Sequence, residues 1–96
     1  MTRRADAGRS RIAPARVAAY EVLRAVNGGA ADLPHALAHH RTRLTDERDR
    51  ALAGEIVTGT LRWMGAFDRV IEQFTRRTIE RLDAEVVDVL RLSIFQ

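Results

Sequence analysis

The sequence predicts a single all-α domain, and three observations support this prediction. Proline occurs only at Pro14 and Pro34, whereas the strong helix formers Ala, Leu, Arg and Glu are plentiful. Hydrophobic residues make up 46% and charged residues 30% of the 96 residues, which is typical of a globular chain. Apolar residues also recur with helical spacing along most of the chain. A chain of this length has room for one hydrophobic core.

The first half predicts two helices. The first begins at Pro14, because proline is favoured at the first helical position, and it ends at Asn27-Gly28-Gly29, which tolerate positive φ. Its apolar stripe consists of Ala19, Val22, Leu23 and Val26. A short second helix over residues 34–41 is expected to bury Leu33 and Leu37.

The second half predicts three more helices. One spans residues 46–64 with Thr45 as its N-cap, and Gly65 separates it from the next. Its expected buried face contains Leu52, Ala53, Ile56, Val57, Leu61 and Met64. The next helix carries a stripe of Phe67, Val70, Ile71 and Phe74.

Asp83 is the expected cap of the last helix, whose apolar residues surround it and predict burial at the centre of an antiparallel bundle. They are Val86, Val87, Val89, Leu90, Leu92, Ile94 and Phe95. Because this helix reaches Gln96 without a cap, we expect a bundle truncated before its last helices, with at least one covering helix missing.

Catalytic and metal sites are not expected. The chain has no cysteine, and therefore no disulfide, thiolate ligand or cysteine nucleophile. His35, His39 and His40 lack further zinc ligands, so we interpret them as a solvated face. A cluster of four acidic residues lies near Arg48 and Arg50 in the sequence. We interpret these acids as groups that compensate the helix dipole and form ion pairs, rather than as acid–base catalysts. The cluster comprises Asp46, Glu47, Asp49 and Glu55.

The positive charge is concentrated at the start of the chain. Residues 1–16 hold five arginines against Asp6 alone, a net charge of +4, whereas the remaining eighty residues have a net charge of −1. We predict a flexible basic arm over residues 1–12 that, with the first helix, binds a phosphate-rich partner. The predicted RNA-binding residues are Arg3, Arg4, Arg9, Arg11 and Arg16. Two alternatives are a solvated tail whose arginines reflect GC-rich codons, and an organellar transit peptide.

Several motifs resemble the NusB-like domain of bacterial 16S rRNA cytosine-5 methyltransferases, the RsmB or Sun family. They are Asp49-Arg50-x-Leu52, Glu55-Ile56-Val57-x-Gly59-x-Leu61-Arg62-Trp63, Asp68 followed by Val70-Ile71, Pro14-Ala15-Arg16 with Ala19 and Leu23, and Leu90-Arg91-Leu92-Ser93-Ile94-Phe95-Gln96. The resemblance covers residues 13–96, and its most specific element is Gly59-Thr60-Leu61-Arg62-Trp63. Residues 27–45 match only in their small residues and Leu37.

The resemblance implies an RNA-binding helical bundle, with 16S rRNA as the expected partner, joined to a downstream catalytic domain. That domain would bind S-adenosylmethionine and carry the catalytic cysteines, so we expect no cofactor in this segment. A cytoplasmic location without membrane contact is expected, because no run approaches 18 apolar residues. The alternatives are a stand-alone antitermination factor of the NusB type, and a protein-interaction bundle that uses Arg62, Arg76, Arg77 and Arg81.

Gly59, Leu61, Arg62, Trp63 and Asp68 are interpreted as a structural motif. A Trp at a helix end with apolar neighbours is more often a core residue, so we predict that Trp63 is buried rather than stacked on a base. Arg62 is expected to anchor a helix terminus or an acid such as Asp68.

Overall fold

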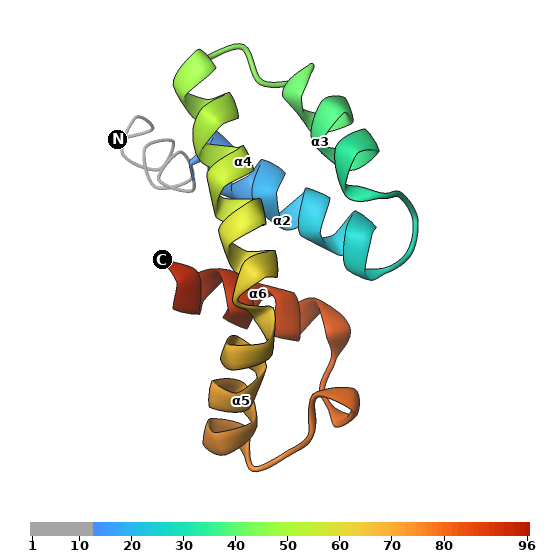
Figure 1. The fold of residues 1–96 in the computed structure, drawn as a ribbon, viewed down its shortest axis with the longest axis vertical. Helices are drawn as coiled ribbons and strands as arrows, with labels where there is room; N and C mark the ends of the chain where they lie inside the picture. The colour runs from blue at the N-terminus through green and yellow to red at the C-terminus, as the bar shows by residue number, and fades with distance from the viewer. Residues whose placement is uncertain (1–12) are drawn as a thin grey trace, which may run out of the picture.

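The computed structural model describes residues 13–96 and is all-helical over that range, which confirms the predicted fold class. Figure 1 shows the elements in order: α2 (Pro14–Asn27), α3 (Leu33–Arg41), α4 (Glu47–Arg62), α5 (Met64–Thr75), the short 3₁₀ helix η1 (Ile79–Arg81) and α6 (Ala84–Phe95). The predicted arm, residues 1–12, lies outside the described residues.

Helix α4 is the central element of the fold. It runs along the long axis of the molecule, and α2 and α6 both cross it (Figure 1). Helix α3 packs on α2, while α5 contacts α6 and continues beyond the lower end of α4. The core therefore lies where α2, α3 and α6 meet α4.

The first helix follows its prediction closely. Pro14 occupies the first turn, the Ala13 cap makes no side-chain hydrogen bond, and the helix ends at Asn27. Gly29 then adopts a φ of 80°, in the left-handed region that glycine enters without strain. The stripe is buried as expected, since Ala19, Val22 and Leu23 are at most 1% exposed.

The buried core is built mainly from small and β-branched side chains. It contains Ala19, Val22, Ala36, Ile56 and Val57. Leu33 and Leu37 pack against this cluster but are only half-buried, and Ala36 is the residue of α3 that is fully buried. The small side chain of Ala36 allows α3 to approach α2 closely.

Both predicted boundaries of the third helix need correction. Asp46, not Thr45, caps α4, because its Oδ1 accepts a hydrogen bond of 2.8 Å from the Arg48 backbone N–H. The helix ends at Arg62, and α5 begins at Met64 with no intervening loop. Trp63, with φ −103° and ψ 15°, forms the junction, so Gly65 does not separate the helices but lies inside α5.

The buried face of α4 is also rotated from its predicted position. Ala53, Ile56 and Val57 are buried as predicted, but Leu52 is 41% exposed and Thr60 is fully buried. The buried stripe therefore runs from residue 53 to residue 60 at helical spacing. Its last member is a polar threonine, whose burial the pattern of apolar residues could not predict.

Helix α6 is not buried on all sides, contrary to its prediction. Asp83 caps it as predicted, since its Oδ1 accepts a hydrogen bond from Glu85 N–H. One face, including Val87, packs on the neighbouring helices, whereas Val86 and Val89 are about half exposed.

The predicted stripe of α5 is likewise only partly covered. Ile71 is buried, but Phe74 is 87% exposed. The physical reason is that α5 packs mainly against α6 and makes few contacts with α4, so Phe74 meets no covering helix among the described residues.

Candidate RNA interface

Of the five predicted RNA-binding arginines, Arg16 is the one that the structure describes. Arg3, Arg4, Arg9 and Arg11 lie outside the described residues. Arg16 is exposed in the first turn of α2, immediately after the predicted arm. Its guanidinium Nε donates a hydrogen bond of 2.9 Å to the Oε1 of Gln96, at the end of α6.

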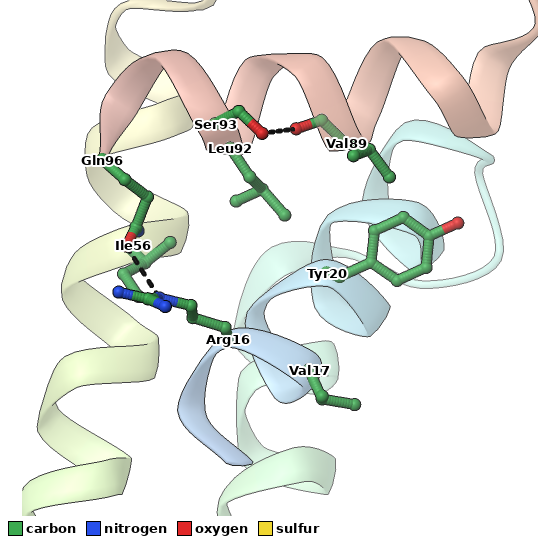
Figure 2. Close-up of a pocket in the computed structure, with 8 residues that line it drawn as sticks. All are labelled: Arg16, Val17, Tyr20, Ile56, Val89, Leu92, Ser93 and Gln96. Carbon is green, nitrogen blue, oxygen red and sulfur yellow. Dashed lines mark hydrogen bonds between the residues drawn. The ribbon is translucent and has the colours of Figure 1, made fainter. Parts of the chain in front are cut away.

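Arg16 lies at the edge of an apolar groove of about 610 Å³ between α2 and α6. Figure 2 shows the residues that line this groove, which come from α2 and α6, with Ile56 of α4 beside Arg16 and Gln96. They are Arg16, Val17, Tyr20, Ile56, Val89, Leu92, Ser93 and Gln96.

The half-buried Tyr20 is the aromatic residue of the groove, one turn of α2 after Arg16. Its hydroxyl points away from the centre of the groove (Figure 2), so the ring lies beside the apolar space. Unpaired RNA bases stack on aromatic rings and on guanidinium planes, and arginine also pairs with phosphate through its planar fork. The groove therefore brings an aromatic ring and a guanidinium group together at one edge.

Sequence reasoning missed Tyr20 and Gln96. Tyr20 lies at i+4 from Arg16 on a helix that was correctly predicted, and this spacing was the available signal. The position of Gln96 could not be foreseen, because it depends on how α6 crosses α2.

Among residues 13–96, no group of three possible metal ligands comes together around the histidines. His35 and His39 are exposed, as predicted, and His35 Nδ1 contacts Asp32 at 2.7 Å. The hydrogen bonds from the backbone N–H and ring of His35 lower the pKa of Asp32.

His40 departs from the predicted solvated face. Its side chain is only 14% exposed, and its Nδ1 lies 3.2 Å from Glu21. Burial lowers the pKa of His40, although the neighbouring Glu21 carboxylate acts in the opposite direction. The lowered pKa favours the neutral imidazole within the contact between α2 and α3.

The structural motif divides into residues that pack and residues that are exposed. Leu61 packs against the core, and a side chain at Gly59 would overlap the ring of Phe95, which explains the glycine. Trp63 is 56% exposed, so its predicted burial is wrong. Trp63 occupies the non-helical junction between α4 and α5, where its indole is exposed.

Asp68 pairs with a different arginine from the one predicted. Arg62 is exposed, whereas Arg91 of α6 binds Asp68 through two hydrogen bonds, Nε to Oδ1 at 2.7 Å and Nη2 to Oδ2 at 2.9 Å. Arg91 also donates to Asp88 at 2.9 Å. Burial acts against the charge of Arg91, but the two carboxylates outweigh it and raise its pKa.

Asp88 is the centre of this buried network and was missed as a structural residue. It is 1% exposed and also accepts hydrogen bonds from Arg24 at 2.9 Å and Asn27 at 2.8 Å, both on α2. The hydrogen bond from Asp88 raises the pKa of Arg24. The network thereby joins α2, α5 and α6. The available signal was that Asp88 and Arg91, three residues apart, are the only charged residues of α6 after Glu85.

Comparison with known protein families identifies the class to which this helical domain belongs. The chain matches the NusB family over residues 13–96, and it belongs to that family.

Among curated proteins, the chain is 40% identical over 101 aligned residues to a protein of Mycobacterium tuberculosis named as a methyltransferase. This alignment covers the whole chain and 21% of that protein. The chain is also 33% identical over 81 residues to the ribosomal RNA small subunit methyltransferase B of Pseudomonas putida, with 84% of the chain and 18% of that enzyme covered. The chain therefore spans about a fifth of the length of these relatives. No solved structure matches it.

Proposed function

We propose that this chain is the RNA-binding domain of a bacterial 16S rRNA cytosine-5 methyltransferase, and that it contributes rRNA recognition rather than methyl transfer. The observation that carries the proposal is the NusB-family match together with a relative named as a ribosomal RNA methyltransferase. The groove supports it, because Arg16 and Tyr20 supply the groups that bind phosphates and unpaired bases.

The methyl-transfer chemistry is assigned to another domain of the parent protein. Residues 13–96 contain no strand, and so no glycine-rich loop between a strand and a helix that would hold the nucleotide part of S-adenosylmethionine. The chain also has no cysteine to attack a cytosine. The cofactor and the catalytic cysteines therefore belong, in this proposal, to a downstream domain in the same chain.

The proposal places the protein in the cytoplasm with the ribosomal RNA. Within residues 13–96, no helix is long and apolar enough to cross a membrane.

The proposed RNA contact begins in the basic arm and continues along α2 into the groove. Five arginines lie between residues 3 and 16, against Asp6 alone. If four of them neutralise phosphates of single-stranded RNA, these contacts contribute about −3 to the slope of log affinity against log salt concentration.

Fluorescence anisotropy with labelled 16S rRNA fragments tests this proposal. We expect a single-stranded or loop-containing fragment to bind more tightly than a fully paired duplex of equal length. Deleting residues 1–12, or replacing Arg16 with Gln and Tyr20 with Ala, should weaken binding and flatten the salt dependence. Replacing Arg62, which is exposed outside the groove, with Gln provides a charge-matched control for Arg16→Gln.

An unchanged salt slope after deletion of residues 1–12 would refute the role of the arm. Equal binding of all fragments and the duplex would refute rRNA recognition. Preferential binding of an antitermination RNA together with a ribosomal-protein partner would instead indicate the stand-alone NusB type.

A further inference from the structure

A second depression, of about 420 Å³, lies at the turn between α5 and η1. It is lined by Arg76, Arg77, Thr78 and Arg81, and all four residues are exposed. In Figure 1 this turn lies at the lower end of the long axis, whereas α3 and the start of α4 lie at the upper end. None of the residues that line this depression also lines the groove between α2 and α6, so the two are separate.

Hydrogen bonds define the backbone conformation of the turn at Arg76 and Arg77. Arg76 caps α5 in the left-handed conformation, with φ 59° and ψ 31°, and its N–H donates to Glu72 O at 2.8 Å. Glycine is the usual residue at such a helix end, because a Cβ is unfavourable there. An arginine at this position places a guanidinium where the backbone alone would favour glycine. Thr75 Oγ1 then accepts a hydrogen bond from Arg77 N–H at 3.3 Å, which fixes the next residue.

Two of the acidic residues near the turn in sequence accept backbone hydrogen bonds. Glu72 accepts a hydrogen bond of 2.9 Å from the N–H of Ile79, and Asp83 caps α6. Glu80 lines a different depression, together with Asp88 and Arg91. Within residues 13–96, no carboxylate lies within ion-pair distance of the three guanidinium groups in the depression.

The chemistry of the depression favours a phosphate chain over a protein partner. Arginine forks pair with phosphate oxygens bidentately. The core of a protein interface is usually formed by aromatic or aliphatic anchors, and the lining of this depression contains none. The carbonyl end of α5 disfavours an anion here, so binding must come from the guanidinium groups themselves.

We propose that Arg76, Arg77 and Arg81 form a second phosphate-binding site that holds the backbone of the RNA bound at the start of α2. This inference rests on the proposed function, because it assigns the same RNA a second contact. Such a strand would reach from the first turn of α2 to the turn after α5, within a molecule whose longest extent is 41 Å.

The test uses the full 96-residue chain and a fluorescein-labelled single-stranded oligouridylate, because phosphate contacts do not depend on base sequence. The cluster variant is R76Q/R77Q/R81Q. The control variant, R41Q/R43Q/R48Q, removes the same charge from exposed arginines near the α3–α4 turn, and these have no ion pair among residues 13–96. Circular dichroism establishes that both variants retain the helicity and melting temperature of the parent.

We expect the cluster variant to flatten the slope of log affinity against log salt by about 2, since each lost contact to a single strand removes roughly 0.7. The control variant should change this slope by less than about 0.35, which is half the effect of one phosphate contact. Equal changes in the two variants would mean that only net charge matters, and would overturn the proposal.

Two further comparisons distinguish a failure of this inference from a failure of the proposed function. If the arm deletion and Arg16→Gln abolish binding while the cluster variant binds normally, the second site is refuted and the proposed function stands. If the cluster variant loses binding while the arm deletion and Arg16→Gln have no effect, the contact at α2 is refuted instead. An oligoglutamate of equal charge that displaces the RNA as well as unlabelled oligouridylate does would show that the cluster binds acidic proteins, and would also overturn the proposal.

Discussion

Replacing Asp88 with alanine removes the acceptor at the centre of the network that joins α2, α5 and α6. The carboxylate is 1% exposed and accepts hydrogen bonds from Arg24, Asn27 and Arg91. Breaking a buried ion pair by removal of one partner costs about 3–5 kcal/mol, because the remaining charge is left uncompensated.

Two features place the expected cost at the lower end of this range. Arg91 keeps both of its hydrogen bonds to Asp68, and the Arg24 side chain, 28% exposed, can reach water. We therefore expect Asp88→Ala to lower the free energy of unfolding by about 3 kcal/mol. A chain of this size has roughly 5–14 kcal/mol in total, so the loss is a large fraction of the stability. It corresponds to a decrease in melting temperature of about 12–24 °C.

Urea denaturation at neutral pH, followed by circular dichroism, measures this loss. Asp83→Ala is the matched control, because it removes an acid from the exposed cap of the same helix and should cost about 1 kcal/mol. A cost for Asp88→Ala no greater than that of Asp83→Ala would refute the conclusion that the network stabilises the fold.

Three further predictions concern the core and the contact between α2 and α3. Gly59→Ala should destabilise the chain, because the added methyl overlaps the Phe95 ring, but in a Phe95→Ala background it should stabilise α4 by up to about 1 kcal/mol; the same sign in both backgrounds would contradict this packing. Thr60→Val should raise the free energy of unfolding by about 1 kcal/mol, because the buried Thr60 Oγ1 has no hydrogen-bond partner among residues 13–96; chemical denaturation measures it, and a loss of stability would reveal a partner. Because the pKa of His40 is lowered in the folded state, the unfolded chain binds more protons, so stability should fall as pH decreases below about 6.5; unfolding midpoints for His40→Asn that show the same decline would exclude His40 as its source.

Local sequence patterns predicted where the helices lie better than they predicted which residues the neighbouring helices bury. The stripe of α2 and the cap at Asp83 depend only on spacing and on a nearby backbone N–H, and both predictions are confirmed. The cap of α4 was misplaced by one residue, because Thr45 and Asp46 are both good caps and their backbone conformations decide between them.

The predictions that failed depend on how helices cross. Trp63 was expected in the core, but the junction between α4 and α5 turns the indole outward. Asp68 has a partner 23 residues away, which no local spacing indicates, so Arg62 was the wrong choice. Apolar residues lie on nearly all sides of α6, so the sequence likewise does not indicate which side of this helix the neighbouring helices cover.

Only the edge of the candidate RNA interface that contains Arg16 could be predicted from the sequence. Charge asymmetry identified the region of Arg16, but the groove also requires residues of α4 and α6. The roles of Arg3, Arg4, Arg9 and Arg11 stay predictions, because these residues lie outside the described part of the chain.

The hydrogen bond between Arg16 and Gln96 joins two residues that are 80 positions apart. Closing so long a segment costs conformational entropy that local helix formation does not. During synthesis, when the amino-terminal part emerges first, α2 can form early, but the groove beside it is completed only once the last turn of α6 has docked. The surface proposed to bind RNA is therefore assembled late in folding, so a chain interrupted before α6 would have the basic residues but not the groove.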